Sequence, residues 1–458
     1  NFSREVIQQT FSGTVGKNKT INVTISRNGD LVHKLYLETP ESEVMSGVEA
    51  NKNYSNPGHA FIDFIELEIG GQTIDKIYGH WMEVWARLSQ PNEAGVVGLL
   101  ENKNQNVFSY INASTASASI TFKDSKTAAP GGKSASAQYQ AADKVLNIPY
   151  YNTRYQRLAG GAGATLINPG HIKGQDGGSG EDHLVVPALS VPLPFWFCKN
   201  PGLALPLIAL QYHEVKLKVK FAGDKGWFLG ENSDVKVWAE YIYLDTPERR
   251  RFAQGTHEYL IEQLQRFEGQ STSNDLEKVD ATMDLNFNHP VKELIFTGGF
   301  NDDRTYGALP GIADSNTTVS LKLNGHDRFS ATRRWDYFSK TQIYEHHTGP
   351  GNLYSGGFEG VRNNLWKEGA GLTTWADIHR ADQIGVYSFA LKPEEHQPSG
   401  TCNFSRIDST RLTFKNLVRT SYAGTELAGA TSIPLTVYAV NYNVLRIMSG
   451  MGGLAYSN

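Results

Sequence analysis

Cysteine is scarce in this sequence, and it has neither long hydrophobic runs nor an excess of charge of one sign. The 458 residues include two cysteines, Cys198 and Cys402, which excludes a disulfide framework, and neither has a second Cys or a His at metal-ligand spacing. The most apolar window, residues 203–210, is too short to span a bilayer and is interrupted by Pro206. We therefore expect two buried thiols and no transmembrane segment.

The charge balance excludes a dedicated nucleic-acid coat. The chain has 47 Asp and Glu against 43 Lys and Arg, a formal charge of -4, and its longest basic run is residues 249–251. Proteins that coat nucleic acid neutralise many phosphates with Lys and Arg, so no direct nucleic-acid binding is expected. A hydrophobic content of 40% over 458 residues indicates a globular protein of two or three domains.

Strands separated by turns dominate the pattern. Residues 31–37 and 61–69 alternate apolar and polar side chains, and a Gly-Gly turn follows the second run. One helix is predicted between a cap at Asp75 and a stop at Pro91, because apolar residues recur there at a spacing of 3.6. Those residues are Ile77, Trp81, Val84, Trp85 and Leu88.

Three stretches have the composition of long surface loops. Residues 94–185 are rich in Ala, Ser, Gly and Asn, and residues 301–316 and 349–371 are similarly polar and rich in Gly. Loops of this length usually connect the elements of a rigid frame at its surface. We expect all three stretches to be excursions of this kind.

A faint internal repeat is the most informative feature of the chain. Five segments of the first half align, in order, with five segments of the second half, at offsets of 259, 254, 197, 197 and 200. The aligned pairs are 32–37 with 291–296, 67–69 with 321–323, 207–210 with 404–407, 215–217 with 412–414, and 235–239 with 435–439. The fall in offset after the second pair places an insertion in the first copy, where the Ala, Ser and Gly-rich loops lie.

The repeat predicts two similar β-domains. We place the first at residues 1–245, with long loop insertions at about 94–185, and the second at 258–458. Residues 246–257, where a strand ends and a charged helical turn begins, form the linker. Sandwiches of the jelly-roll kind suit this number of strands and these loops.

No motif assigns a catalytic, cofactor-binding or metal-binding residue. Residues 132–134 resemble the end of a phosphate-binding loop, but the first Gly of that motif is missing. Residues 181–183 place carboxylates beside an imidazole, without a nucleophilic Ser in a strand-to-helix turn. His213 lacks a second His one helical turn on, and His346 and His347 are adjacent, so we expect structural or solvated histidines.

Glycan chemistry is the one modification that the sequence suggests. Of seven Asn-X-Ser/Thr sequons, those at Asn112 and Asn316 lie in expected loops and are the candidate glycosylation sites. An aromatic content of 11% also leaves open a tandem β-sandwich glycan-binding protein with Trp227 and Trp366 on its loops. A glycoside hydrolase is a third possibility, because two carboxylates need only meet in space.

The segment from Tyr387 to Asp408 closely resembles the signature of the major capsid proteins of large icosahedral double-stranded DNA viruses, in their algal-virus branch. Further resemblance lies in residues 26–31, 68–75, 201–215, 323–329 and 441–455. It spans nearly the whole chain apart from residues 94–185 and 349–384. In the family a further segment precedes the stretch that matches residues 1–10, and the chain begins with Asn1, so we expect a processed or trimmed form.

The resemblance implies an all-β double jelly roll: two consecutive eight-stranded β-sandwiches with short helices and long surface loops. It implies a structural capsid protein without enzymatic activity or cofactor, which forms a homotrimer, the pseudo-hexagonal capsomer. Capsomers would tile the icosahedral virion shell around an internal membrane and the DNA genome. Expected partners are neighbouring capsomers, penton proteins and minor capsid proteins, with assembly in the host cytoplasm and the loops on the outer surface.

Overall fold

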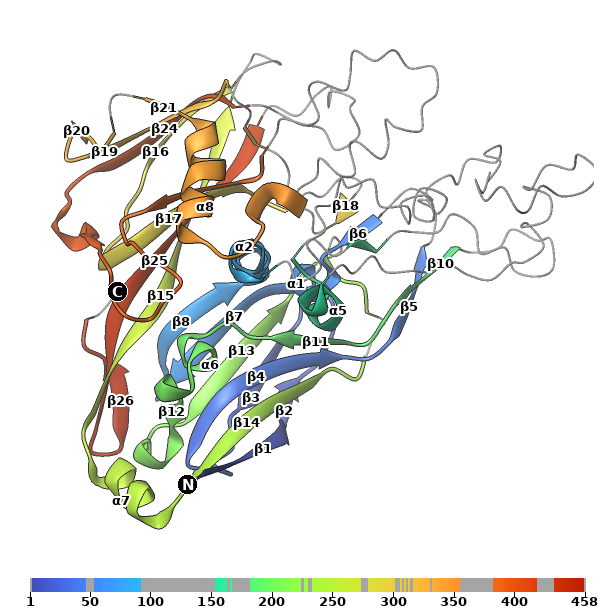
Figure 1. Cartoon of the computed structure of the whole chain (residues 1–458). Helices are drawn as coiled ribbons and strands as arrows, with labels where there is room; N and C mark the ends of the chain where they lie inside the picture. The colour runs from blue at the N-terminus through green and yellow to red at the C-terminus, as the bar shows by residue number, and fades with distance from the viewer. Residues whose placement is uncertain are drawn as a thin grey trace, which may run out of the picture.

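The computed structural model shows two β-sandwiches, one built from the first half of the chain and one from the second (Figure 1). The N-terminus lies at the lower end in this view, beside the helix that connects the sandwiches. The structure describes residues 2–46, 53–91, 153–162, 165–166, 182–223, 226–229, 233–272, 279–300, 305–306, 309, 312–313, 316–329, 332–354, 382–417 and 432–456.

The first sandwich packs two sheets with strand orders β1-β14-β4-β11 and β2-β3-β13-β7-β8, and β12 extends the first sheet beside β4. Its strands are β1 (Phe2–Gln9), β2 (Phe11–Gly13), β3 (Thr20–Thr24), β4 (Leu31–Thr39), β7 (Ile62–Ile69), β8 (Gln72–Tyr78), β11 (Leu189–Pro192), β12 (Leu205–Pro206), β13 (Val215–Phe221) and β14 (Lys236–Leu244).

The second sandwich repeats this plan with the orders β15-β25-β17-β22 and β16-β24-β19-β20, while β23, β26 and β21 pair with β17, β25 and β19. Its strands are β15 (His257–Thr272), β16 (Val279–Asp284), β17 (Pro290–Gly298), β19 (Thr318–Leu323), β20 (His326–Asp327), β21 (Arg333–Arg334), β22 (Ile384–Ser388), β23 (Cys402–Asn403), β24 (Thr410–Leu417), β25 (Ser432–Met448) and β26 (Met451–Leu454).

Short strands and helices complete the described part. Two small sheets have the orders β10-β5 and β18-β6-β9. Their strands are β5 (Ser42–Ser46), β6 (Asn53–Ser55), β9 (Thr165–Leu166), β10 (Asp182–Val186) and β18 (Thr305–Tyr306). The helices are α1 (Pro57–Ala60), α2 (Gly79–Ser89), α5 (Arg154–Ala159), α6 (Trp196–Lys199), α7 (Thr246–Gln254), α8 (Gln342–His346), η1 (Pro201–Leu203), η2 (Leu207–Ala209), η3 (Tyr337–Thr341), η4 (Gly351–Tyr354) and η6 (Phe404–Arg406).

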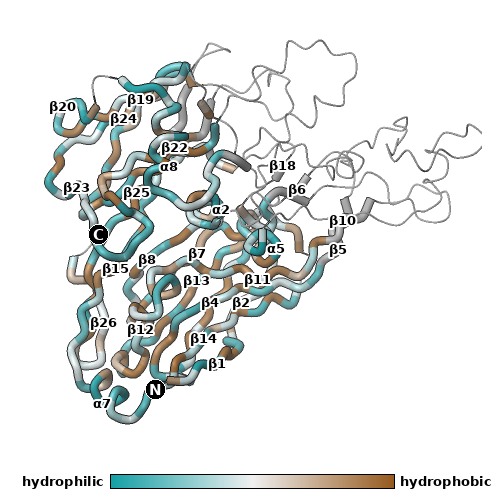
Figure 2. The backbone as a smooth tube through the Cα atoms, in the orientation of Figure 1, coloured by the Kyte–Doolittle hydropathy of each residue, from teal (hydrophilic) through white to brown (hydrophobic). Residues whose placement is uncertain are grey.

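The alternation read from the sequence decides which side chains fill each sandwich. In β13, Val215, Leu217, Val219 and Phe221 point inward and are buried, while the lysines between them are more exposed. Figure 2 shows the result, with brown segments alternating with pale or teal ones along the strands of both sandwiches. The second core is closed in the same way by residues of β17, β19, β24 and β25.

The sequence repeat is confirmed by the strand register, down to a β-bulge. In the first sandwich Ala239 pairs with Leu35, and the register then shifts so that Tyr241 pairs with Val32. In the second, Ala439 pairs with Leu294 and Asn441 pairs with Val291. These pairs are related by the predicted offsets of 200 and 259. In the opposite sheets the equivalent strands also pair, with a register that differs by two residues, which preserves the inward face.

The bulge holds a buried polar residue in each copy. His33 Nδ1 lies 2.7 Å from the Phe197 carbonyl oxygen, and Lys292 Nζ lies 2.6 Å from the Pro393 carbonyl oxygen. Both carbonyls belong to the segment that follows the outer strand of the same sheet, β11 or β22. The extra residue of a bulge interrupts the alternation of side chains along the strand. The side chains of His33 and Lys292 therefore reach a loop carbonyl oxygen that accepts a hydrogen bond from them.

Two details of the expected secondary structure are wrong. The predicted helix exists as α2, but Asp75 does not cap it, because Asp75 and Ile77 belong to β8 and the helix begins at Gly79. The stretch 94–185 is not entirely loop, because residues 154–159 form α5. Thr153 and Gln156 make a reciprocal capping box that offsets the cost of starting this short helix.

Truncation of a core aromatic tests the second sandwich. Phe414 is fully buried, so Phe414→Ala should lower the free energy of unfolding by about 3–5 kcal/mol through lost burial and a cavity. Denaturation in guanidinium followed by tryptophan fluorescence measures the change. The neighbouring exposed Lys415 provides the control, because Lys415→Ala should change stability by less than about 0.5 kcal/mol. Equal effects of the two variants would contradict this core.

Candidate functional site at the seam between the sandwiches

Helix α2 forms the contact between the sandwiches. It begins at Gly79, where a Cβ atom would lie 2.1 Å from the Ile62 carbonyl oxygen and 2.2 Å from that of His59, so only glycine fits. The next residue, His80, places Nδ1 2.7 Å from the Tyr438 hydroxyl and Nε2 2.6 Å from the Gly298 carbonyl oxygen. Burial lowers the pKa of His80 to about 3. The ring is therefore neutral, donates from Nε2 and accepts the Tyr438 hydroxyl proton at Nδ1.

One turn further along α2, a buried carboxylate organises a polar cluster. Glu83 accepts from Arg87 Nε at 2.6 Å and lies 2.8 Å from His59 Nδ1. Arg87 also donates to the side-chain oxygen of Gln383 in the second sandwich. Burial alone would raise the pKa of Glu83, but the Arg87 charge and the His59 hydrogen bond lower it to about 2. The carboxylate is thus charged and fully enclosed.

A second cluster joins the sandwiches through Glu262 of β15. Its carboxylate lies 3.0 Å from Lys199 Nζ of α6 and also contacts Lys292 Nζ of β17, which is completely buried. Burial opposes the charge on Glu262, yet the two lysines lower its pKa to about 2. The same burial lowers the pKa of Lys292. One carboxylate therefore holds two ammonium groups, one from each sandwich.

A third cluster surrounds His347, which follows α8. Its Nε2 lies 3.0 Å from Glu293 and its Nδ1 lies 3.0 Å from Glu394, while Trp85 of α2 meets the ring edge to face at 6.1 Å. Burial disfavours the charged ring, but the two carboxylates outweigh it and raise the pKa of His347 to about 9. His347 is therefore an imidazolium at neutral pH, with each ring N–H donating to a carboxylate.

A fourth contact pairs the edges of the two sandwiches. Asp75 of β8 accepts from the backbone N–H of Leu264 in β15 at 3.2 Å, and Gln263 donates to the Ile74 carbonyl oxygen. Burial raises the pKa of Asp75 to about 7. These hydrogen bonds satisfy backbone groups that the strands would otherwise leave unpaired at the seam.

The seam is suited to holding two bodies in one orientation rather than to catalysis. The charges of Glu83, Glu262 and His347 are already paired with other side chains. Buried ion pairs contribute little net stability but strongly disfavour alternative arrangements that would separate the charges. In the described part of the chain, no group of three or more His, Cys, Asp or Glu could hold a metal ion. No described helix is long and apolar enough to cross a membrane.

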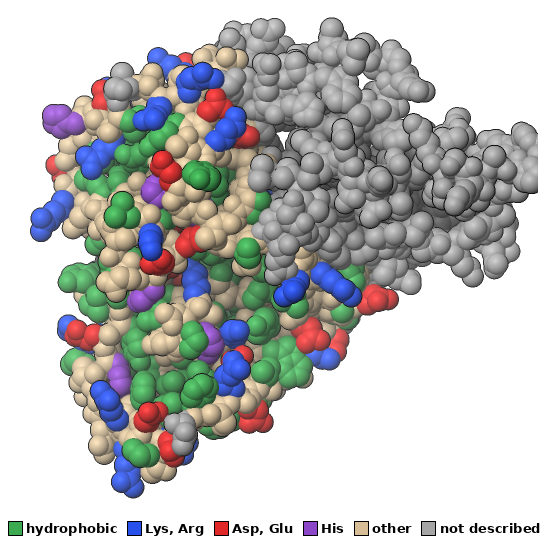
Figure 3. Space-filling model, viewed as in Figure 1, with side chains coloured by type: hydrophobic (Ala, Val, Ile, Leu, Met, Phe, Trp, Pro, Cys, Tyr) green, Lys and Arg blue, Asp and Glu red, His purple; other side chains and the backbone are tan. Residues whose placement is uncertain are grey.

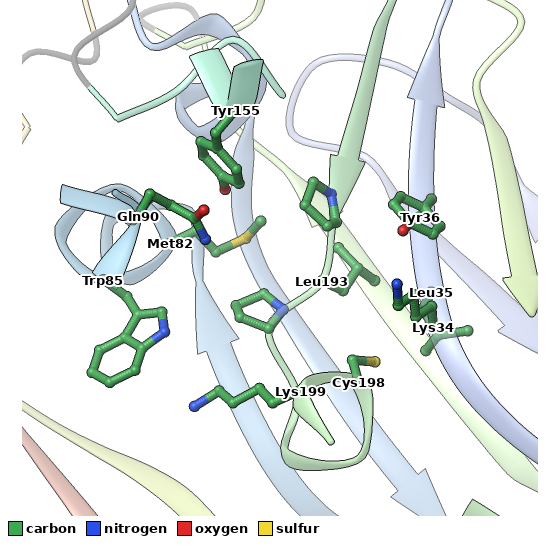
Figure 4. A pocket seen from close by; sticks show the side chains of 13 residues that line it. Lys34, Leu35, Tyr36, Met82, Trp85, Gln90, Tyr155, Leu193, Cys198 and Lys199 are labelled. Atoms are coloured by element: carbon green, nitrogen blue, oxygen red, sulfur yellow. The ribbon is translucent and has the colours of Figure 1, made fainter. Parts of the chain in front are cut away.

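A cavity of about 250 Å³ lies beside the seam, between β4, α2 and α6 (Figure 4). On the wall of the cavity, Lys199 Nζ lies 4.5 Å from the centre of the Trp85 ring, and Cys198 also lines the cavity. Burial raises the pKa of the Cys198 thiol to about 12, so this cysteine is not a thiolate nucleophile. The cavity is lined chiefly by apolar and aromatic groups and holds no nucleophile paired with a base.

Among the residues that the structure describes, the candidates predicted from the sequence do not come together in a reactive site. Asn316 is exposed just before β19, and glycosylation there stays a prediction, while Asn112 lies outside the described residues. His213 Nδ1 contacts the backbone of Gly452 in the second sandwich, at 3.0 Å from its carbonyl oxygen, so it is structural. Trp227 is partly buried and packs edge to face on Phe221 at 5.4 Å, against the core of the first sandwich.

Other candidates fall where no side chain is described: residues 132–134, residues 181–183 and Trp366. The cysteines are free and half-buried, so the expectation of buried thiols holds only in part. The seam residues Glu83, Glu262 and Lys292 were missed. A polar Lys-Glu pair inside the otherwise apolar run of β17 was the available signal.

Comparison with protein families matches the two halves of the chain to two models. "Major capsid protein N-terminus" matches residues 1–123 and 178–245, and "Large eukaryotic DNA virus major capsid protein" matches residues 248–355 and 375–453. The chain is 38% identical to the major capsid protein of Pyramimonas orientalis virus, over 100% of this chain and 91% of the relative. It is 33% identical to that of Paramecium bursaria Chlorella virus 1, over 100% and 92%.

Solved structures show the same fold. A chain of the PBCV-1 virus capsid quasi-atomic model is 30% identical, with a TM-score of 0.63 over 100% of this chain and 97% of that one. The Faustovirus major capsid protein, 11% identical, has a TM-score of 0.58 over 98% and 91%. The fold is thus the double jelly roll, and the curated relatives are structural shell proteins rather than enzymes.

The titration of His347 should change the stability of the protein with pH. Its pKa is raised from 6.5 to about 9, so its contribution is fully present below pH 6.5 and is lost as the pH rises through 9. The free energy of unfolding should fall by up to about 3 kcal/mol between pH 6.5 and 10. In His347→Gln this fall should largely disappear. The free energy of unfolding of the parent and of His347→Gln is measured against pH by chemical denaturation. The same fall with pH in both proteins would refute the raised pKa of His347.

Removal of one seam carboxylate should be costly. Glu262→Gln leaves Lys292 buried without a counter-charge, and we expect about 3–5 kcal/mol lower stability in chemical denaturation. Glu258→Gln is a matched control on the same strand, because Glu258 is exposed and pairs with exposed Arg446. The control should change stability by less than about 0.5 kcal/mol. A loss of similar size in both variants would show that Glu262 does not hold the seam.

Proposed function

We propose that three copies of this chain, which belongs to the major capsid proteins of large eukaryotic DNA viruses, form a pseudo-hexagonal capsomer. Such capsomers would tile an icosahedral shell. The observation that carries the proposal is that the sheets β1-β14-β4-β11 and β15-β25-β17-β22 share their strand order and their β-bulge. Two similar bodies in each of three copies supply six similar outer edges. A closed shell needs units that make nearly equivalent contacts with six neighbours.

The two similar sandwiches also suggest how the chain divides into domains. We place the first domain at residues 1–245, the linker at 246–257 and the second domain at 258–458. Helix α7 supports this division, because it connects β14 to β15 at one end of the molecule and none of its residues is buried (Figure 1). The seam clusters would keep the two domains at a fixed angle, which a shell unit requires if its edges are to meet neighbours consistently.

Within the virion, we propose that the shell encloses an internal membrane and the DNA genome, and that capsomers contact penton and minor capsid proteins after assembly in the host cytoplasm. The chain itself would not bind nucleic acid. Charged side chains of both signs are interspersed over the described part of the face in Figure 3, with no broad basic field. The alternative of a glycan-binding protein gains no support, since Trp227 is partly buried and packs against the core of the first sandwich.

The oligomeric state tests the capsomer. Mass photometry of the purified chain at micromolar concentration should give a particle about three times the 50.6 kDa chain mass. Obligate subunit interfaces of this kind bury on the order of 2,000 Å² or more, so the trimer should persist on dilution to nanomolar concentration. A monomer at every concentration would contradict the proposal.

A further inference from the structure

The outer face of the sheet β15-β25-β17-β22 shows how an apolar sheet face is covered within this chain. This face carries Ile295, Tyr438 and Val386, which are fully buried although they point away from the second core. Helix α2 of the first sandwich covers them, with Trp81 packed on the Tyr438 ring at 5.0 Å. An apolar outer face is therefore hidden by the helix of a neighbouring sandwich.

The equivalent face of the first sandwich is covered only in part. At the offsets of 259 and 200, Tyr36 corresponds to Ile295 and Trp238 to Tyr438, and both are partly exposed. Beside them on β1, the side chain of Val6 is 52% exposed and that of Phe2 70%. The two sheets have the same strand order. We call this uncovered surface, made by Phe2, Val6, Tyr36 and Trp238, the open sheet face.

The second sandwich carries a helical segment in the same chain position as α2. In the first copy α2 lies between β8 and β11, and in the second η3 and α8 lie between β21 and β22. Tyr344 of this segment is 88% exposed, and Tyr337 is partly exposed with Arg333 stacked on its ring at 3.4 Å. We call Tyr337 and Tyr344 with the exposed surface around them the open helix face.

We infer that the open sheet face of one copy is the docking site for the open helix face of a second copy. The two faces lie apart within one chain, because β1 is at the lower edge of the first sandwich and α8 belongs to the second sandwich above it (Figure 1). Association is therefore head to tail, with a different surface contributed by each partner. The inference rests on the proposed capsomer and names the surfaces that join it.

Repetition of the internal seam between copies would close the chain into a ring. If the joint between copies repeats the geometry of the joint between sandwiches, each joint turns the chain by the same angle. Six equal joints, three within copies and three between them, complete one circle when that angle is one sixth of a full turn. A heterologous contact that did not repeat the internal angle would generate an open filament instead.

Two single variants test the two faces. Val6→Glu places an unpaired carboxylate on the open sheet face, and Tyr344→Glu does so on the open helix face. Each should raise the concentration of half-assembly, measured by mass photometry, by about 100-fold or more, since burying an unpaired charge is strongly unfavourable. Met451→Glu is the control, because Met451 is 51% exposed and lies on neither face, and this variant should assemble like the parent.

A mixture of the two variants is the decisive arm. Val6→Glu retains its helix face and Tyr344→Glu retains its sheet face, so the mixture should form one-to-one dimers with a single intact joint and no closed trimers. Circular dichroism should match the parent for each variant, because both sites are exposed in the single chain. Persistent trimers in either variant, or a mixture that stays monomeric, would overturn the inference while leaving a parental trimer intact. A monomeric parent would instead overturn the proposed function.

Discussion

The packing of α2 on the second sandwich is the contact on which the rest of the structure depends. One face of the sheet β15-β25-β17-β22 closes its own core, and the other is also apolar, with Ile295 and Tyr438 fully buried. A sheet with two apolar faces needs a second layer, and α2 supplies it. The two sandwiches are therefore joined through a shared hydrophobic cluster rather than a flexible tether.

The charged clusters give this apolar contact its orientation. Hydrophobic burial favours contact but tolerates sliding, whereas Glu262 must meet both Lys199 and Lys292, and Arg87 must reach Gln383. The raised pKa of His347 and the lowered pKa of Glu262 both express that pairing. A unit whose two halves keep a fixed angle can repeat that angle in an assembly.

Sequence patterns were sufficient for the architecture and insufficient for the seam. The period-2 alternation and the offsets of 259 and 200 located equivalent strands, because inward positions of a sandwich constrain residue type strongly. The start of α2 was misplaced, since the period of 3.6 runs through Ile77, which belongs to β8. Lys292 and Glu262 are far apart in sequence, and their meeting depends on tertiary packing that no local pattern records. The Lys-Glu pair within β17 marked the place but not the partner.

We expect the joint inside the chain and the joint between chains to be equivalent. Electron cryomicroscopy of the purified assembly, at a resolution that separates strands, measures this directly. The expected result is a threefold particle with six similar sandwiches, in which a helix covers the outer face of every sheet that contains the bulge. A particle in which β1 and β14 face solvent, or in which the two kinds of joint differ in angle, would contradict it.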